Sequence, residues 1–205
     1  MHIDLSYRLS GNQPIHCDHG YALFASVSRL LPEVHAENGI AIHPIGGRQN
    51  GDRQMTLMPW STLSFRVAAE KIPVLLSLAG KSLVLHDATV RVGVPEVRTL
   101  APATALRSRL VVIKVAHTDA AALTAETFAA AARKQMEQLA ISSEVMLSIG
   151  KRRTLRMKQR EVVGYEVIVE GLTAEESIAL QENGIGGKRH MGCGVFLPLG
   201  EKVMP

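Results

Sequence analysis

The amino-acid sequence predicts an α+β protein made of two tandem ferredoxin-like units, each with the βαββαβ element order of RRM domains. Two observations support this prediction. Runs with the strand period of two alternate with runs of the helical period, and the same order of elements occurs twice within 205 residues. A segment with two prolines, VPEVRTLAPATA at 94–105, lies between the two halves. The units are therefore expected at residues 1–94 and 106–205.

The elements of the first unit follow from alternation and from residues that begin or end helices. Apolar residues occupy every second position of residues 2–9, which predicts a half-buried strand. Asp18 is expected to cap the start of a helix. That helix is expected to end near Leu31, because Pro32 follows it. The other expected elements are a strand at 39–45, a loop at 46–52, a strand near 63–69, a short helix at 73–80 and a strand at 83–92.

The second unit repeats this order with a longer middle hairpin. Thr124 is expected to cap an alanine-rich helix that runs to about Leu139. Thr173 and Glu176 form the pattern of a capping box, and Gly184 is expected to end that helix. The expected strands lie at 109–115, 144–149, 152–160, 162–170 and 194–199.

Composition excludes several classes of protein. The net charge of +4 and a sequence pI near 9.3 favour a polyanionic partner, but aromatic residues make up only 4% of the chain. No apolar stretch approaches the roughly 18 residues of a membrane span, so no membrane partner is expected. Cys17 and Cys193 lie far apart in the sequence without a CxxC motif, so no structural zinc site is expected. A reduced, cytoplasmic setting is the expectation for a chain with so few cysteines.

The segment between the last helix and the last strand, GIGGKRHMGCG at 184–194, combines glycine with positive charge. Glycines let a backbone approach a ligand and expose N–H groups to phosphate, while Lys and Arg supply charge. The alternative is a loop whose glycines only permit tight turns. The order helix–loop–strand disfavours nucleoside triphosphate binding, because a P-loop follows a strand. The residues expected to contact a polyanion are Gly184, Gly186, Gly187, Lys188, Arg189, His190, Gly192 and Gly194.

The spacing Gly184-x-Gly186-x5-Gly192-x-Gly194 resembles the C-terminal glycine pattern of CRISPR RNA-processing endoribonucleases, which belong to the repeat-associated mysterious protein (RAMP) superfamily. Three further segments are similar to its short Myxococcus-type branch: DHGYALFASVSRLLP at 18–32, IHPIGGR at 42–48 and VVGYEVIVEGLTAEES at 162–177. The resemblance implies binding of a CRISPR repeat RNA, often a stem-loop, and cleavage within each repeat without a metal or cofactor.

A second basic segment independently favours the same kind of partner. KRRTLRMKQR at 151–160 holds six basic residues and no acidic one. A strand of period two places Leu155 and Met157 on one face with Arg153. The other face would carry Arg152, Arg156, Lys158 and Arg160. The alternative to a phosphate-binding groove is a solvated edge hairpin protected by charge. The scarcity of aromatic rings favours an A-form stem, which proteins recognise through its shape and phosphates.

Metal-free RNA cleavage needs a base, an acid and cations near the phosphate, and histidine can serve as acid or base. His35 is the first candidate, because the resemblance implies a catalytic histidine soon after the first helix. His19, at the start of that helix, is the second, with helix capping or packing as its alternative. A surface histidine is the alternative for His35, and a phosphate contact is the expected role of His190.

The remaining histidines and the second catalytic group are less specific. We expect structural roles for His16 and His43, and ordinary ones for His2, His86 and His117. Some relatives carry a tyrosine within the first helix as the partner of the histidine. Here that position corresponds to Ser28, with Tyr21 one or two turns earlier. Lys188 or Arg189 is the alternative group for stabilising the transition state.

The sequence therefore predicts a CRISPR repeat endoribonuclease that leaves a 5′-hydroxyl and a 2′,3′-cyclic phosphate. The resemblance also implies that it can stay on its product as a subunit of a CRISPR effector complex. The alternative from another class is a catalytically silent RNA-binding subunit with the same fold. An unrelated ferredoxin-like metabolic enzyme is the most distant alternative, since neither a cofactor motif nor paired carboxylates support it.

Overall fold

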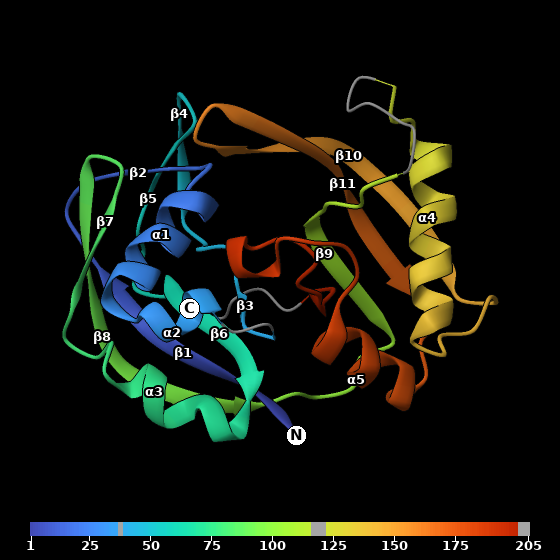
Figure 1. Cartoon of the computed structure of the whole chain (residues 1–205), viewed down its shortest axis with the longest axis horizontal. Coiled ribbons are helices and arrows are strands. Elements are labelled where there is room, and N and C mark those ends of the chain that lie inside the picture. Colours follow the sequence, from blue (N-terminus) through green and yellow to red (C-terminus); the bar gives the residue numbers. More distant parts are fainter. Residues whose placement is uncertain (37–38, 116–121, 201–205) are drawn as a thin grey trace. The chain divides into compact units, whose positions relative to one another are not determined.

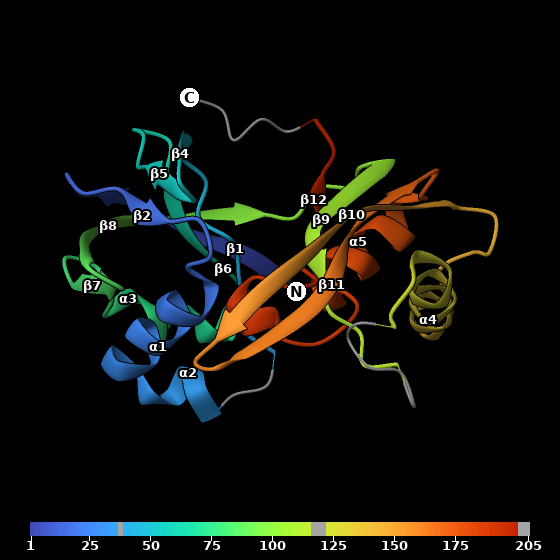
Figure 2. The same ribbon diagram turned by 90° about the horizontal axis from the view of Figure 1, so that it is seen from above.

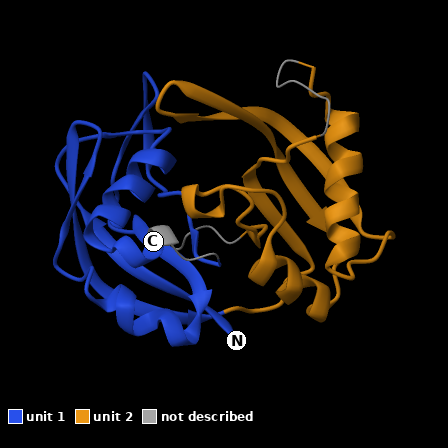
Figure 3. Ribbon diagram, viewed as in Figure 1, with its two compact units in different colours: residues 1–99, 202–205 blue, residues 100–201 orange. Residues whose placement is uncertain are grey.

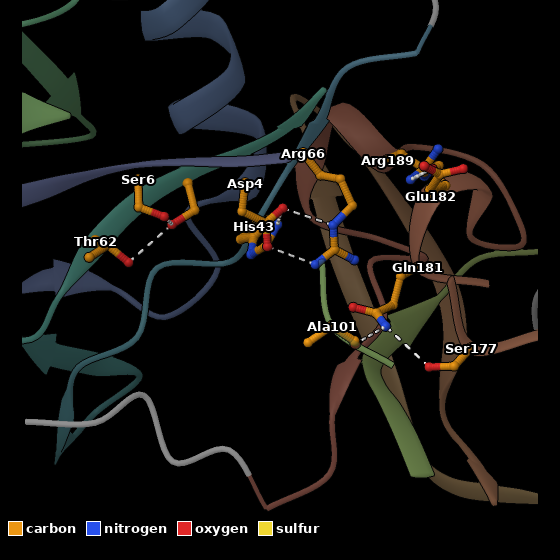
Figure 4. Close-up of polar contacts among 11 residues, drawn as sticks. Asp4, Ser6, His43, Thr62, Arg66, Ala101, Ser177, Gln181, Glu182 and Arg189 are labelled. Atoms are coloured by element: carbon orange, nitrogen blue, oxygen red, sulfur yellow. Dashed lines mark hydrogen bonds and ion pairs between the residues drawn. The ribbon is translucent and has the colours of Figure 1, made fainter. Parts of the chain in front are cut away.

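The computed structural model describes residues 1–36, 39–115 and 122–200, and the chain separates after Thr99 into two compact units (Figure 3). The boundary lies beyond residue 94 because strand β8 (Ala88–Thr99) continues through Pro95. Residues 101–104 are then bound to the second unit. The amide of Ala103 donates to Ser177 Oγ at 2.9 Å. Gln181 Nε2 donates to the carbonyl of Ala101, also at 2.9 Å (Figure 4).

The first unit contains an antiparallel five-stranded sheet in the order β3-β6-β1-β8-β7. Its first four strands have the order of a ferredoxin-like sheet. Tyr7 on β1 donates its hydroxyl to the carbonyl of Leu75 on α3 at 2.6 Å, so strand and helix are joined inside the core. The elements (Figure 1) are β1 (His2–Ser10), β2 (Ile15–His16), α1 (Gly20–Leu30), α2 (Pro32–Ala36), β3 (Ala41–Ile42), β4 (Arg48–Gly51), β5 (Gln54–Thr56), β6 (Thr62–Ala68), α3 (Ile72–Leu76), β7 (Ser82–Leu85) and β8.

Several expected boundaries in this unit are wrong because tight turns were not recognised. The expected loop at 46–52 contains β4 and leads into β5, which joins β2 and β4 in a small third sheet. Asp52 and Arg53, both with positive φ, make the turn between β4 and β5. The expected strand at 83–92 is the hairpin β7–β8, which turns at His86 with φ 56°. The expected strand at 39–45 shortens to β3.

The second unit contains a four-stranded antiparallel sheet in the order β10-β11-β9-β12, which matches β3-β6-β1-β8 of the first. The prediction of two tandem ferredoxin-like units is thus confirmed. Both predicted caps are confirmed as well, since Thr124 and Thr173 each take part in a capping box. The elements are β9 (Ala105–Val111), α4 (Ala125–Gln138), β10 (Met146–Met157), β11 (Arg160–Glu170), α5 (Ala174–Asn183), a 3-10 turn at Arg189–Met191 and β12 (Leu197–Pro198).

Helices α4 and α5 pack on one face of the second sheet, which we call the helix face. Phe128 and Met136 of α4 and Leu180 of α5 form a buried cluster with Val167 and Val169 of β11. Figure 2 shows this unit from a second direction. In the described parts of the chain, no helix is long and apolar enough to cross a membrane.

Candidate nucleic-acid interface

The glycine-rich loop at 184–194 closes on itself at its two ends. Gly184 has φ 60° and Gly194 has φ 63°, in the left-handed region that favours glycine. A Cβ on Gly184 would overlap the carbonyl oxygen of Gly194, and a Cβ on Gly194 would overlap that of Ile185. A Cβ on Gly186, which has φ 78°, would also overlap a carbonyl oxygen, that of Val112. These three glycines are therefore required by the packing of the loop itself.

The backbone N–H groups of the five loop glycines are already satisfied inside the protein. Gly186 donates to Gln135 Oε1 on α4 at 2.7 Å, and Gly194 donates to the carbonyl of Leu110 at 2.8 Å. The acceptors for Gly184, Gly187 and Gly192 are the carbonyls of Leu180, Val112 and Arg189. The expectation that these N–H groups face a phosphate is not met. The loop instead extends the hydrogen bonding of β9.

The three cations of the loop differ in exposure. Lys188 is exposed and has φ 65°, and its neighbour Gly187 is exposed with open space beside it. Arg189 is half-buried and donates from its guanidinium to the carbonyl of Glu182 at 2.8 Å, at the end of α5 (Figure 4). His190 is half-buried within the 3-10 turn. Lys188 is thus the loop cation that is best placed to meet an external anion.

The basic segment at 151–160 spans a hairpin and not one strand. The strands expected at 144–149 and 152–160 form the single strand β10, with a register shift between Ile149 and Arg152. Lys158 and Gln159 make the turn, and Lys158 has φ 54°. Arg160 begins β11 and pairs with Met157. The prediction of a continuous strand to residue 160 is wrong, because the chain reverses two residues earlier.

The hairpin divides its arginines between the two faces of the sheet. Leu155 is buried against Leu110 and Cys193, so it lies on the face that the glycine-rich loop covers, which we call the loop face. Arg152 and Arg156 are exposed and alternate with Leu155, which places them toward the helix face. Opposite residues of antiparallel strands share a face, so Arg160 lies with Met157 on the loop face. Its expected grouping with Arg152 and Arg156 is therefore wrong.

The loop face also holds a charged cluster. Glu166 on β11, with a side chain 10% exposed, accepts a hydrogen bond from Arg107 Nε on β9 at 2.5 Å. Arg153 on β10 places a guanidinium nitrogen 3.9 Å from the other carboxylate oxygen. Burial raises the pKa of Glu166, but the two arginines and the amide of Lys151 lower that pKa by more. The carboxylate is therefore ionised at neutral pH.

His19 is held by two backbone groups. It precedes α1 as the N-cap residue, in the place expected for Asp18, and it is 3% exposed. The amide of Ile45 donates to His19 Nε2 at 3.0 Å, so Nδ1 carries the proton and donates to the carbonyl of His16 at 3.0 Å. Both ring nitrogens are thus engaged, as a histidine that orders the chain around α1 would require.

His35 lies in the short helix α2, where a position in an irregular segment after the first helix was expected. Its side chain is outside the described part of the structure, as is the whole of His117. Ser28 lies on α1, and its buried Oγ has no hydrogen-bond partner among the described residues. Tyr21 is half-buried on the first turn of the same helix.

The first sheet also holds a buried polar cluster that was not expected from the sequence. Arg66 on β6 is 1% exposed and donates from two nitrogens to the carboxylate of Asp4 on β1, at 2.8 Å each (Figure 4). His43 Nε2 lies 3.3 Å from the same carboxylate. Burial raises the pKa of Asp4, but His43 and Arg66 lower that pKa well below its usual value of 3.8. The sequence signal for this cluster was Asp4, an acidic residue inside a strand of alternating apolar residues.

Comparisons with known proteins place this architecture in context. A family model described as Cas6 Crispr matches residues 3–201. The CRISPR-associated endonuclease Cas6 of Myxococcus xanthus (strain DK1622) is 35% identical over 198 residues, which are 97% of this chain and 82% of that protein.

Two solved structures show the same fold. One is described as a Cas6-related gene from Pyrococcus furiosus, with a TM-score of 0.70, 16% identity and coverage of 98% of this chain and 100% of that chain. The other is Thermus thermophilus Cse3 bound to an RNA that represents a pre-cleavage complex. Its TM-score is 0.55, with 14% identity and coverage of 96% and 98%. At such identities these likenesses show a common fold alone.

Proposed function

Because the chain belongs to the Cas6 family of CRISPR proteins, we propose that it is an endoribonuclease that cuts CRISPR repeat RNA in precursor transcripts. The observation that carries this proposal is the 35% identity to a Cas6 endonuclease over 97% of the chain. Such identity over the whole length includes both units and not a single shared domain. The retained fold and the two basic segments of the second unit support the same function.

The proposed reaction is an internal transesterification. A base removes the proton of the ribose 2′-hydroxyl, and the 2′-oxygen attacks the adjacent phosphorus. The bond to the 5′-oxygen breaks as an acid donates a proton to that oxygen. The products are a 2′,3′-cyclic phosphate and a 5′-hydroxyl, so the step consumes neither water nor an oxidant and does not require a metal ion.

His35 is the histidine we propose for proton transfer. His19 remains the second candidate, but the two backbone hydrogen bonds of its ring favour a positioning role in the segment around α1. Lys188 is proposed to stabilise the charge on the pentavalent phosphate, because it is the exposed cation of the glycine-rich loop.

RNA binding is proposed to use the basic residues of the second unit. Arg152, Arg156 and Lys158 are exposed on the hairpin and would contact phosphates of a repeat stem-loop. Arg160 would contribute from the loop face, together with Lys188 and His190. The glycines at 184, 186, 187, 192 and 194 would act by shaping the loop. Retention of the product within a CRISPR effector complex is part of the same proposal.

A catalytically silent RNA-binding subunit is the second candidate, and the engaged ring of His19 favours it by leaving fewer histidines for catalysis. One experiment separates the two functions. The protein is incubated in EDTA with its repeat RNA and with the same RNA carrying a 2′-deoxy nucleotide before the scissile bond. We expect cleavage of the first RNA only. Binding without cleavage of either RNA would support the silent subunit, and cleavage of the deoxy substrate would contradict the proposed chemistry.

A further inference from the structure

A cationic site on the loop face of the second sheet is built from three neighbouring strands. It consists of Arg107 on β9, Arg153 on β10 and Glu166 on β11, which lies between them. Arg107 Nε donates to Glu166 at 2.5 Å, and Arg153 places a guanidinium nitrogen 3.9 Å from the second carboxylate oxygen. Two positive charges therefore flank one negative charge, and the cluster keeps a net positive charge.

The backbone around Glu166 is shaped to hold its carboxylate. The register of β10 against β11 shifts between Ile149 and Arg152, and Gly150 lies within this irregular stretch. A Cβ on Gly150 would lie 2.9 Å from Glu166 Oε2, so a larger residue would crowd the carboxylate. The amide of Lys151 also donates to Glu166. The carboxylate thus has several fixed donors, and it fixes the direction of the Arg107 guanidinium in turn.

The two arginines keep capacity for a further acceptor. The Arg107 side chain is 45% exposed, and the Arg153 side chain is 31% exposed. The Nε of Arg153 is buried and has no hydrogen-bond acceptor among the described residues. Because this atom is buried, an external acceptor would bind through the solvent-exposed parts of the two side chains. Planar guanidinium groups match the oxygens of phosphate particularly well.

The site lies on the same face as the glycine-rich loop. Arg153 is two residues from Leu155, which packs against Cys193 of that loop. Arg152 and Arg156, the hairpin arginines expected from the sequence to bind phosphate, point toward the opposite face. Arg107 and Arg153 therefore share the face of the sheet that the glycine-rich loop covers, whereas Arg152 and Arg156 do not.

We propose that Arg107 and Arg153, positioned by Glu166, bind a phosphodiester group of the RNA backbone. The proposal rests on the proposed function for the identity of the ligand, since RNA supplies the phosphodiester. The contact is independent of sequence, because it involves backbone oxygens and no base edge. Glu166 acts through the arginines and does not touch the RNA.

The test compares variants of the full-length chain by their affinity for the repeat RNA and for an unrelated RNA hairpin, over a range of salt concentrations. In the double variant Arg107→Ala/Arg153→Ala, we expect at least ~10-fold weaker binding of both RNAs near physiological salt. We also expect the slope of log Kd against log salt to fall by about one to two. Lys134→Ala, which removes an exposed charge from α4, is the matched control and should change neither quantity.

Two conservative variants distinguish the proposed positioning of the guanidinium groups by Glu166 from an effect of net charge or of a folding defect. Arg107→Lys keeps the charge but loses the planar donors, so we expect affinity between those of the wild type and the double variant. Glu166→Gln adds one net positive charge, and simple charge counting would predict tighter binding. Positioning predicts weaker binding, because the guanidinium groups lose their fixed direction. Tighter binding of Glu166→Gln would overturn the positioning role.

The outcomes also separate this site from the proposed function. If the wild-type protein cuts its repeat and the double variant keeps wild-type affinity and salt slope, the cluster is only a structural ion pair and the inference falls. A lower unfolding temperature in that variant would agree with the same conclusion. If the wild type shows no preference for the repeat, yet the double variant binds both RNAs more weakly, the site stands and the repeat-specific function falls.

Discussion

His19 and His35 belong to neighbouring elements of the first unit, but substitution should affect them differently. Removing the His19 ring leaves the amide of Ile45 and the carbonyl of His16 without partners, which costs about 1–3 kcal/mol each. We expect His19→Ala to lower the unfolding midpoint and to reduce cleavage only as far as it reduces the folded fraction. His35→Ala should keep the wild-type midpoint and slow single-turnover cleavage by roughly 10²–10⁴-fold, the usual loss for a general acid or base.

The measurement pairs denaturant unfolding with single-turnover cleavage, and repeat binding serves as the control for an intact interface. Full cleavage activity in His35→Ala would remove His35 from the mechanism. A His19→Ala protein that is folded and binds RNA, but does not cleave it, would restore His19 as a catalytic residue.

Substitution of individual glycines in the loop should change the unfolding free energy by different amounts. Gly194→Ala forces a side chain into the left-handed region and against the carbonyl oxygen of Ile185. We expect a loss of at least ~1–2 kcal/mol in unfolding free energy. Gly187→Ala meets open space and lacks a positive φ, so its unfolding free energy should stay within about 0.5 kcal/mol of the wild type. Urea titration provides both values. Equal stability of the two variants would show that the loop ends repack freely.

At the level of single residues, the sequence identified the charged and glycine positions of the loop better than their surroundings. The cations at 188 and 189 were recognised, but only the fold shows that Arg189 turns back to the carbonyl of Glu182. The glycine spacing indicated a loop with unusual backbone geometry. It could not show whether the N–H groups of that loop are available to a ligand or are hydrogen-bonded to carbonyls at the end of β9. That distinction depends on a partner strand more than 70 residues earlier, which no local pattern encodes.

Among the elements, β1 and β6 are joined by the buried pair Asp4–Arg66, which makes their pairing depend on pH. The pKa of Asp4 is lower in the folded state than the usual 3.8, so folding favours its ionised form. This contribution to stability is fully present above the unfolded pKa and declines as pH falls below about 4 toward the folded value. Removing the Asp4 charge leaves the buried Arg66 guanidinium without its counter-ion, which costs about 3–5 kcal/mol of stability.

We therefore expect Asp4→Asn to be most destabilised relative to the wild type near neutral pH, with the difference shrinking below about pH 4. Urea unfolding between pH 2.5 and 7 measures this difference. Asp87→Asn, at an exposed turn, is the control and should show little difference at any pH. A difference that stays constant over the whole range would contradict the role assigned to the Asp4 charge.

The elements that the sequence predicted well are those whose signals are local. Alternation identified β1, and the threonine caps identified the starts of α4 and α5. Hairpins whose turns lack an Asn-Gly or Asp-Gly pair were missed or displaced. The turns at His86 and Lys158 each place a non-glycine residue at positive φ, which propensity alone disfavours. Pairing across the sheet stabilises these turns, so they emerge only with the tertiary fold.

For the whole molecule, the positive charge is concentrated in the second unit. Residues 1–99 hold nine Lys and Arg against eight Asp and Glu, whereas residues 100–205 hold fourteen against eleven. Six of these fourteen lie at 151–160. A net charge of +4 therefore understates the local field that an RNA would meet at the hairpin. The scarcity of aromatic rings agrees with recognition through phosphates.

The two faces of the hairpin allow a test of how RNA uses this charge. The triple variant Arg152→Ala/Arg156→Ala/Lys158→Ala removes the exposed cations of the helix face and the turn. If each contacts a phosphate, the slope of log Kd against log salt should fall by about one per residue, to a maximum near three. Binding should weaken equally for repeat and unrelated hairpins, because no base contact is lost. Salt titrations of RNA affinity give both quantities, and an unchanged slope would show that RNA does not touch this face.

Combining the triple variant with Arg107→Ala/Arg153→Ala then tests whether RNA contacts both faces of the hairpin. Additive losses would mean that RNA contacts both faces around the hairpin end, since independent sites add in free energy.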